Sequence, residues 1–224
     1  MAILLNLETA TTNCSVSAAK DGTILALKEY NSGGYSHSEK LHLFIEEVLA
    51  EASLTMQDVE AVAVSKGPGS YTGLRIGVSA AKGLCFALQI PLISIATLES
   101  MAHQVTDFKG YIIPLLDARR MEVYAQAFNE AYTPVGETKA EIITEESFLS
   151  YAEEQPVMLV GSGAEKCKEV LKHPNFKFLT TVVPSAREMA ALSNKKFKEN
   201  DFEDVAYFEP YYLKDFILQT KKKA

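Results

Sequence analysis

The residues of this chain that could do chemistry are two carboxylates and a glycine-rich loop. Glu8 and Asp117 each end a short apolar run, so both carboxylates are predicted to stand at the ends of strands. Carboxylates in that position could hold Mg²⁺ and orient a water molecule. The segment that follows Glu8, residues 9–13, has hydroxyl groups but no glycine, so a phosphate there would meet Cβ atoms. We therefore favour polar strand ends that cap turns.

The glycine-rich loop, Gly67-Pro-Gly-Ser-Tyr-Thr-Gly73, lies between a predicted strand and a predicted helix. Glycines allow close approach of another group, and free N–H groups at a helix start could hold a phosphate. The loop matches neither the P-loop pattern nor GxGxxG, so a structural turn is the alternative. A second turn places Gly161 and Gly163 where they could line an adenosine pocket, although any strand–turn–helix junction favours glycine. These two glycines are the candidate nucleotide-binding residues.

Other catalytic groups have no recognisable pattern. His37 and His42 are five residues apart, so on a helix they do not share one face, and no HExxH spacing occurs. The three cysteines, Cys14, Cys85 and Cys167, have no CxxC spacing and are predicted to be reduced thiols in a cytosolic protein. We expect no catalytic residue, no bound metal and no cofactor.

The composition is that of a globular protein. The 224 residues are 47% hydrophobic and 23% charged, with a formal net charge of −7, which excludes a disordered chain and argues against a broad nucleic-acid-binding face but not against a local basic patch. No apolar run approaches the roughly 18 residues of a membrane helix, and the N-terminus lacks the features of a signal peptide. We expect a cytoplasmic protein without membrane contact.

The chain reads as two similar α/β halves, each opening with a strand that ends in a carboxylate and a tight return. We predict two lobes with mixed sheets, residues 1–108 and 109–224. The first lobe is expected to hold helices over 38–52, 72–88 and 97–105. The second is expected to hold strands over 111–116, 122–128, 137–143 and 157–160, and helices over 144–153, 164–171 and 185–198. Tyr211, Tyr212 and Phe216 are interpreted as anchors that dock the tail.

Small residues on the predicted helix 72–88 point to close packing. Gly73, Gly77, Ala80, Gly83 and Ala87 make a smooth face, although glycine inside a helix costs about 1 kcal/mol relative to alanine. Close approach of another helix could offset that cost, either helix 38–52 of the same chain or a partner subunit. The candidate partner-binding residues are His37, Leu41, Phe44, Ile45, Val48, Gly73, Ile76, Gly77, Ala80, Gly83, Leu84 and Ala87.

Four segments of the chain carry a resemblance to a known family. They are residues 3–17, residues 37–41, the string Gly67-Pro-Gly-Ser-Tyr-Thr-Gly-Leu-Arg-Ile-Gly77, and Asp117-Ala-Arg-Arg-Met-Glu-Val-Tyr124. In order and spacing they closely resemble the bacterial TsaB (YeaZ) family over nearly the whole chain. The string from 67 to 77 is highly specific.

The resemblance implies a two-lobed actin/Hsp70/sugar-kinase (ASKHA) fold and a non-catalytic scaffold or dimerisation subunit. Such a subunit binds the catalytic subunit TsaD, which transfers threonylcarbamoyl from threonylcarbamoyl-AMP to N6 of the tRNA adenosine beside the anticodon. The ATPase TsaE is also required, tRNA is met only through the complex, and the chain alone is expected to form a homodimer. TsaD holds its metal with an HxxxH pair, which this chain lacks. The alternative is a glycoprotease-like hydrolase or an ATP-dependent transferase acting alone.

Overall fold

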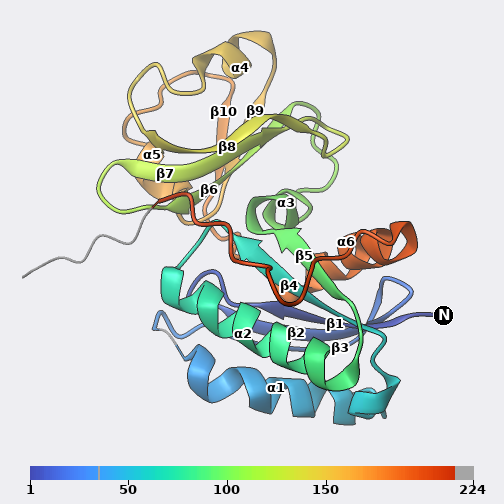
Figure 1. The fold of residues 1–224 in the computed structure, drawn as a ribbon. Helices are drawn as coiled ribbons and strands as arrows, with labels where there is room; N and C mark the ends of the chain where they lie inside the picture. The colour runs from blue at the N-terminus through green and yellow to red at the C-terminus, as the bar shows by residue number, and fades with distance from the viewer. Residues whose placement is uncertain (35, 215–224) are drawn as a thin grey trace, which may run out of the picture.

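A computed structural model, which describes residues 1–34 and 36–214, contains two five-stranded mixed sheets (Figure 1). Sheet A has the strand order β3-β2-β1-β4-β5, and sheet B has the order β10-β9-β6-β7-β8. Read from its other edge, sheet B repeats the order of sheet A strand for strand. The predicted duplicated α/β arrangement is therefore confirmed.

Sheet A consists of β1 (Ile3–Glu8), β2 (Cys14–Lys20), β3 (Thr23–Tyr30), β4 (Ala61–Gly67) and β5 (Leu92–Ala96). Sheet B consists of β6 (Tyr111–Asp117), β7 (Glu122–Phe128), β8 (Pro134–Ile142), β9 (Val157–Val160) and β10 (Phe176–Leu179). The α-helices are α1 (His37–Glu51), α2 (Tyr71–Leu88), α3 (Thr97–Ala102), α4 (Leu149–Glu154), α5 (Ala164–Cys167) and α6 (Ala186–Glu199), and a 3₁₀ turn spans Met56–Asp58.

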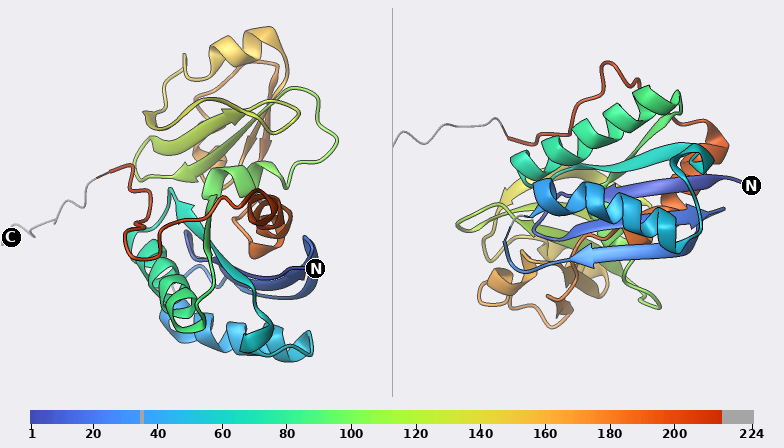
Figure 2. Two further views of the ribbon diagram at one scale, coloured as in Figure 1. Left: turned by 45° about the vertical axis from the view of Figure 1, so that its right-hand side comes forward. Right: turned by 90° about the horizontal axis from the view of Figure 1, so that it is seen from below.

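Three long helices cover sheet A, two on one face and one on the other (Figure 2). The apolar side chains on one face of α1 and on the inner face of α2 pack against β1, β2 and β4 in one continuous core cluster. On the opposite face α6 buries Met189 and Leu192 against β1, β4 and β5. Ser193 Oγ of α6 donates to Asn6 Oδ1 at 2.7 Å, so these two buried polar side chains satisfy each other.

Sheet B is covered by shorter elements. α4 and α5 pack on one face, and α3 packs on the other face, where Leu98 and Met101 are fully buried. Because α3 directly follows β5 of sheet A, it joins the two sheets. α6, which follows sheet B in the chain, returns to sheet A, and the division of lobes at residues 108 and 109 stays a prediction. No helix among the described residues is long and apolar enough to cross a membrane.

The short elements of the second half differ from their prediction. α4 begins at Leu149 rather than at residue 144, because Phe148 has a left-handed backbone (φ 61°) and a turn precedes it. α5 is limited to Ala164–Cys167, although it was predicted to reach residue 171, and β10 was not predicted. These elements have four to six residues, which is too few for a clear helical or strand periodicity.

The tail runs from sheet A toward sheet B. Glu203 pairs with Leu92 at the edge of β5, and Lys82 of α2 donates to the carbonyl oxygens of Ala206 and Phe208. Tyr211 N donates to Lys66 O at 2.7 Å, and the ring of Tyr212 lies 4.8 Å from that of Tyr71. The interpretation of Tyr211 and Tyr212 as docking anchors agrees with these contacts, and Phe216 lies outside the described residues.

Candidate partner-binding site

The candidate site lies on the outer faces of α1 and α2, which run side by side below sheet A in Figure 1. The side chain of Ser70 caps α2 by accepting a hydrogen bond from Gly73 N at 3.2 Å. Leu74, Val78 and Ala81 then bury the inner face of α2 in the core of the first lobe. The opposite face of α2 is left without a covering element among the residues that the structure describes.

Between the two helices an open groove has a volume of about 760 Å³. Its lining residues are Ser38 and His42 of α1 and Tyr71, Thr72, Arg75, Ile76, Ser79, Ala80, Gly83 and Leu84 of α2. The floor is apolar and small, because Ile76, Ala80 and Leu84 are half-buried and a Cβ atom added at Gly83 would meet nothing within 4 Å. Phe86, one turn beyond Gly83 on α2, exposes 74% of its surface, so apolar area extends beyond the groove.

The predicted partner-binding residues divide into a surface set and a buried set. Ile76, Ala80, Gly83 and Leu84 line the groove, and Ala87 is exposed on the same helix. The buried set is His37, Leu41, Phe44, Ile45, Val48, Gly73 and Gly77. We assign the buried set to the core and to the contact with loop 9–13, because solvent does not reach these residues. They support the groove from beneath.

Two of the helix glycines have an intramolecular explanation. A Cβ atom at Gly73 would clash with Thr9 O, and one at Gly77 would clash with Thr9 Oγ1. Thr9 Oγ1 in turn donates to Gly73 O at 2.8 Å. Close packing of α2 on the loop after β1, rather than of a partner chain, therefore requires Gly73 and Gly77. Only Gly83, farther along the helix, is free of such contacts.

His37 holds the same loop from the α1 side. Its Nε2 lies 2.7 Å from Thr11 O, and the ring is buried. Burial lowers the pKa of His37, so the neutral ring is favoured at this position. The residue therefore positions loop 9–13 and does not form part of the groove surface.

The glycine-rich loop is filled by the chain itself. A Cβ atom at Gly69 would stand 2.5 Å from Ala10 O, and one at Gly67 would stand 2.8 Å from Tyr211 O. Ala10 O also accepts a hydrogen bond from Ser70 N at 2.7 Å. The loop is thus a structural turn that receives loop 9–13 and the tail, which is the alternative that the sequence left open.

The strand-end carboxylate Glu8 is fully buried beside that loop. Its Oε1 accepts a hydrogen bond from Ala10 N at 2.5 Å. Burial raises its pKa to about 7, and the hydrogen bonds from Ala10, Ser65 and Thr9 oppose that rise only in part. Among the described residues no group of three His, Cys, Asp or Glu side chains is placed to hold a metal ion. Glu8 therefore caps the turn after β1 in this structure.

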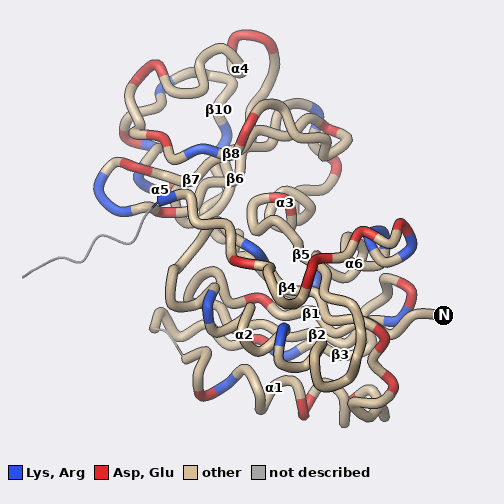
Figure 3. The backbone as a smooth tube through the Cα atoms, in the orientation of Figure 1, with Lys and Arg blue, Asp and Glu red and all other residues tan. Residues whose placement is uncertain are grey.

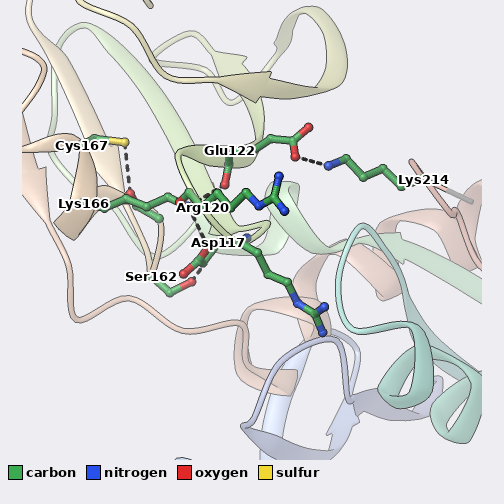
Figure 4. Close-up of polar contacts among 9 residues, drawn as sticks. Asp117, Arg120, Glu122, Ser162, Lys166, Cys167 and Lys214 are labelled. Carbon is green, nitrogen blue, oxygen red and sulfur yellow. Dashed lines mark hydrogen bonds and ion pairs between the residues drawn. The ribbon is translucent and has the colours of Figure 1, made fainter. Parts of the chain in front are cut away.

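The second strand-end carboxylate, Asp117, is occupied by neighbours (Figure 4). Its Oδ1 accepts hydrogen bonds from Arg119 N and from Lys166 Nζ, both at 2.7 Å. The Lys166 ammonium also donates to Arg120 O and Glu122 O at 2.8 and 2.6 Å. Asp117 thus closes the β6–β7 turn together with α5, as expected for a strand end that caps a turn.

Gly161 and Gly163, the candidate nucleotide-binding residues, are packed against the chain's own groups. A Cβ atom at Gly161 would stand 2.7 Å from Leu115 O, and one at Gly163 would stand 2.9 Å from Val123 Cγ1. Close packing of the turn after β9 on Leu115 of β6, Val123 of β7 and Met101 of α3 is sufficient to explain both glycines. A nucleotide role for them stays a prediction.

Sequence reasoning missed the polar rim of the groove. Tyr71 and Arg75 lie four residues apart on α2, and the Arg75 guanidinium donates to Tyr71 Oη at 3.2 Å and lies over the ring. Ser38 and His42 form the opposite rim on α1. The i, i+4 spacing of both pairs was visible in the sequence, but nothing in the sequence distinguishes a groove rim from an ordinary exposed helix face.

Known proteins resemble the chain over nearly its full length. The family model described as "TsaD: tRNA N6-adenosine threonylcarbamoyltransferase" matches residues 32–222. The tRNA threonylcarbamoyladenosine biosynthesis protein TsaB of Escherichia coli K12 is 27% identical over 228 residues, covering 97% of this chain and 97% of that protein. Its namesake in Bacillus subtilis strain 168 is 28% identical over 220 residues, covering 94% and 93%.

A solved structure shares the fold. A Pseudomonas aeruginosa protein described as similar to peptidase YEAZ superposes with a TM-score of 0.85 at 24% sequence identity, covering 96% of this chain and all of that one. Together with the two sheets of identical strand order, this similarity confirms the predicted two-lobed ASKHA-type fold class.

Proposed function

The chain belongs to the TsaD family and, within it, to the TsaB (YeaZ) group, and from that premise we propose that it is the scaffold subunit of a tRNA-modifying complex. Its involvement in the formation of threonylcarbamoyladenosine on tRNA follows from the relatives that share its full length. The finer proposal is that the chain binds a TsaD-type catalytic subunit and does not itself catalyse the transfer. TsaE and tRNA join through that complex.

The open groove between α1 and α2 is the observation that carries this proposal. A half-buried apolar floor with exposed Phe86 on the same helix is a surface that a second polypeptide would bury with a gain in free energy. The polar rim that Arg75 and His42 provide resembles the rim of many protein interfaces. We place this interface in the first lobe, residues 1–108.

The chemical groups of the chain support a non-catalytic role. Both strand-end carboxylates, Glu8 and Asp117, are engaged in closing turns. The spacing of five between His37 and His42 does not provide the HxxxH pair expected of TsaD, and His37 is buried against Thr11. The groups that would hold a metal in the catalytic relative are thus absent from this sequence or used for structure.

Gly83 offers a variant that tests the proposal without disturbing the fold. A Gly83→Glu side chain would enter open space on a helix, where glutamate is a better helix former than glycine. It would also place a charge over the apolar floor. We expect the cognate catalytic subunit, tagged and co-expressed, to retain wild-type chain and to lose the Gly83→Glu chain. The modification of tRNA by the reconstituted complex should fall in parallel.

Two control variants make the result specific. Gly83→Ala adds only a methyl group and should still be retained by the catalytic subunit. Ala131→Glu makes a comparable change at an exposed alanine of the β7–β8 connection and should also be retained. Retention of Gly83→Glu at wild-type stoichiometry would show that the groove is not the interface.

A further inference from the structure

The turn between β6 and β7 carries two arginines in an unfavourable backbone conformation. Arg119 and Arg120 have φ angles of 71° and 50°, both in the left-handed region. They lie in the three-residue loop 119–121, since Asp117 pairs with Val123 and Ala118 N donates to Glu122 O. Left-handed backbone is disfavoured for L-residues other than Asn and Asp. Such strain is kept where the surrounding structure enforces it, and it collects at functional positions.

The surrounding structure does enforce this turn. Glu122 N donates to Arg119 O at 3.1 Å, and Ala118 N donates to Glu122 O at 3.0 Å. Lys166 of α5 reaches across from a distant part of the chain and fixes Asp117 and the carbonyl oxygen of Arg120. The two arginines are therefore held at the tip of the hairpin by bonds that do not involve their own side chains.

The charges around the turn leave both guanidinium groups unpaired. Asp117 pairs with Lys166, and Glu122 pairs with Lys214 of the tail (Figure 4). Both local carboxylates are thereby neutralised. Arg119 and Arg120 are exposed and form no hydrogen bond or ion pair through their side chains with any residue in 1–34 or 36–214. The turn is thus a local positive tip on a chain with a net charge of −7, visible as a blue loop beside α5 in Figure 3.

We propose that this turn is a phosphate contact through which the chain itself touches the RNA backbone. Guanidinium groups bind phosphate oxygens with two parallel hydrogen bonds, and such contacts position RNA without reading its sequence. A free nucleotide would present the same phosphate chemistry, and the ADP arm of the test below distinguishes it from RNA. The proposal rests on the function proposed above and extends it, since there tRNA was met only through other subunits.

The test replaces the two arginines by Asn and Gly, which tolerate the left-handed backbone at these positions. The double variant Arg119→Asn/Arg120→Gly should fold at least as stably as wild type in urea denaturation. The chain in complex with its catalytic subunit is titrated with a fluorescent, unmodified tRNA transcript over a range of salt concentrations. We expect roughly tenfold lower affinity and a slope of log K against log salt that is smaller by about 2. Lys195→Gln/Lys198→Gln, which removes two exposed charges from α6, should change neither.

The other possible results of the tRNA titration would contradict the proposed phosphate contact. Unchanged affinity and slope in the double variant, or an equal loss in the α6 control, would overturn the proposal. A second experiment records the backbone amide NMR resonances of residues 117–123 during titration with ADP. The proposal would also be overturned if millimolar ADP alone shifted these resonances and displaced the bound transcript from the turn. Partner retention is measured separately for the double variant and should be unaffected. If no complex with the catalytic subunit forms, the isolated chain is titrated with the transcript, and the shifts of these resonances still report whether the turn binds RNA. Failure of the proposed partner binding is therefore distinguishable from failure of the proposed RNA contact.

Discussion

At the scale of single residues, the buried carboxyl of Glu8 makes the stability of the chain depend on pH. Its pKa is raised from 4.5 to about 7 by burial, so the folded state favours the neutral form. A raised pKa gives stability that is complete below pH 4.5 and is lost as the pH rises through 7. Glu8→Gln keeps the shape and an acceptor for Ala10 N. We expect it to raise the free energy of unfolding at pH 8 by up to roughly 3 kcal/mol.

The measurement compares wild type and Glu8→Gln by urea denaturation at pH 4.5 and pH 8. The difference in the free energy of unfolding between the two proteins reports the ionisation of Glu8, because the contributions of His37 and His103 are common to both. The gain should be large at pH 8 and small at pH 4.5. A gain that does not depend on pH would show that folding does not raise the pKa of Glu8, and a loss of stability confined to pH 8 would show that the folded chain stabilises the carboxylate.

At the scale of the helix, two glycines of α2 should respond in opposite directions to the same change. A methyl group at Gly77 would meet Thr9 Oγ1 and force apart the contact between α2 and loop 9–13. We expect Gly77→Ala to lower the free energy of unfolding by about 1–2 kcal/mol, since overpacking exceeds the gain in helix propensity. Gly83→Ala meets open space and should raise it by about 0.5–1 kcal/mol.

Thermal and urea unfolding of the two variants against wild type measure this difference. Both substitutions are Gly→Ala in the same helix, so the gain in helix propensity is the same for both. The difference between their effects on the free energy of unfolding therefore reports the contact of residue 77 with Thr9. Equal effects of the two variants would mean that loop 9–13 yields without cost, and that Gly77 is not required by packing.

The same helix shows how far sequence reasoning reaches. The apolar periods of α1 and α2 are long enough to predict both helices to within one or two residues, and the repeat of strand and carboxylate predicts the duplication. The sequence does not show which small residues of the helix pack against the same chain and which are left exposed for a partner. Thr9 lies 64 residues before Gly73, and Lys166 lies 49 residues after Asp117. Contacts between such distant residues decide the roles of the glycines and carboxylates, and spacing alone does not contain them.

At the scale of the whole molecule, one groove is proposed to serve two assemblies. We expect the isolated chain to form a homodimer through α1 and α2, because the apolar floor and the exposed Phe86 remain uncovered in the single chain. A twofold pairing would place the same surface of each copy against the other. Self-pairing and binding of the catalytic subunit then exclude each other.

Sedimentation velocity distinguishes this arrangement from two separate interfaces. The wild-type chain should sediment as a concentration-dependent dimer, Gly83→Glu as a monomer, and Gly83→Ala as wild type. Addition of the catalytic subunit should convert the homodimer into a mixed complex rather than add to it, because the groove can be covered only once. If Gly83→Glu abolished partner binding but left the homodimer intact, the two assemblies would use different surfaces. The homodimer and the mixed complex would then not compete for the groove.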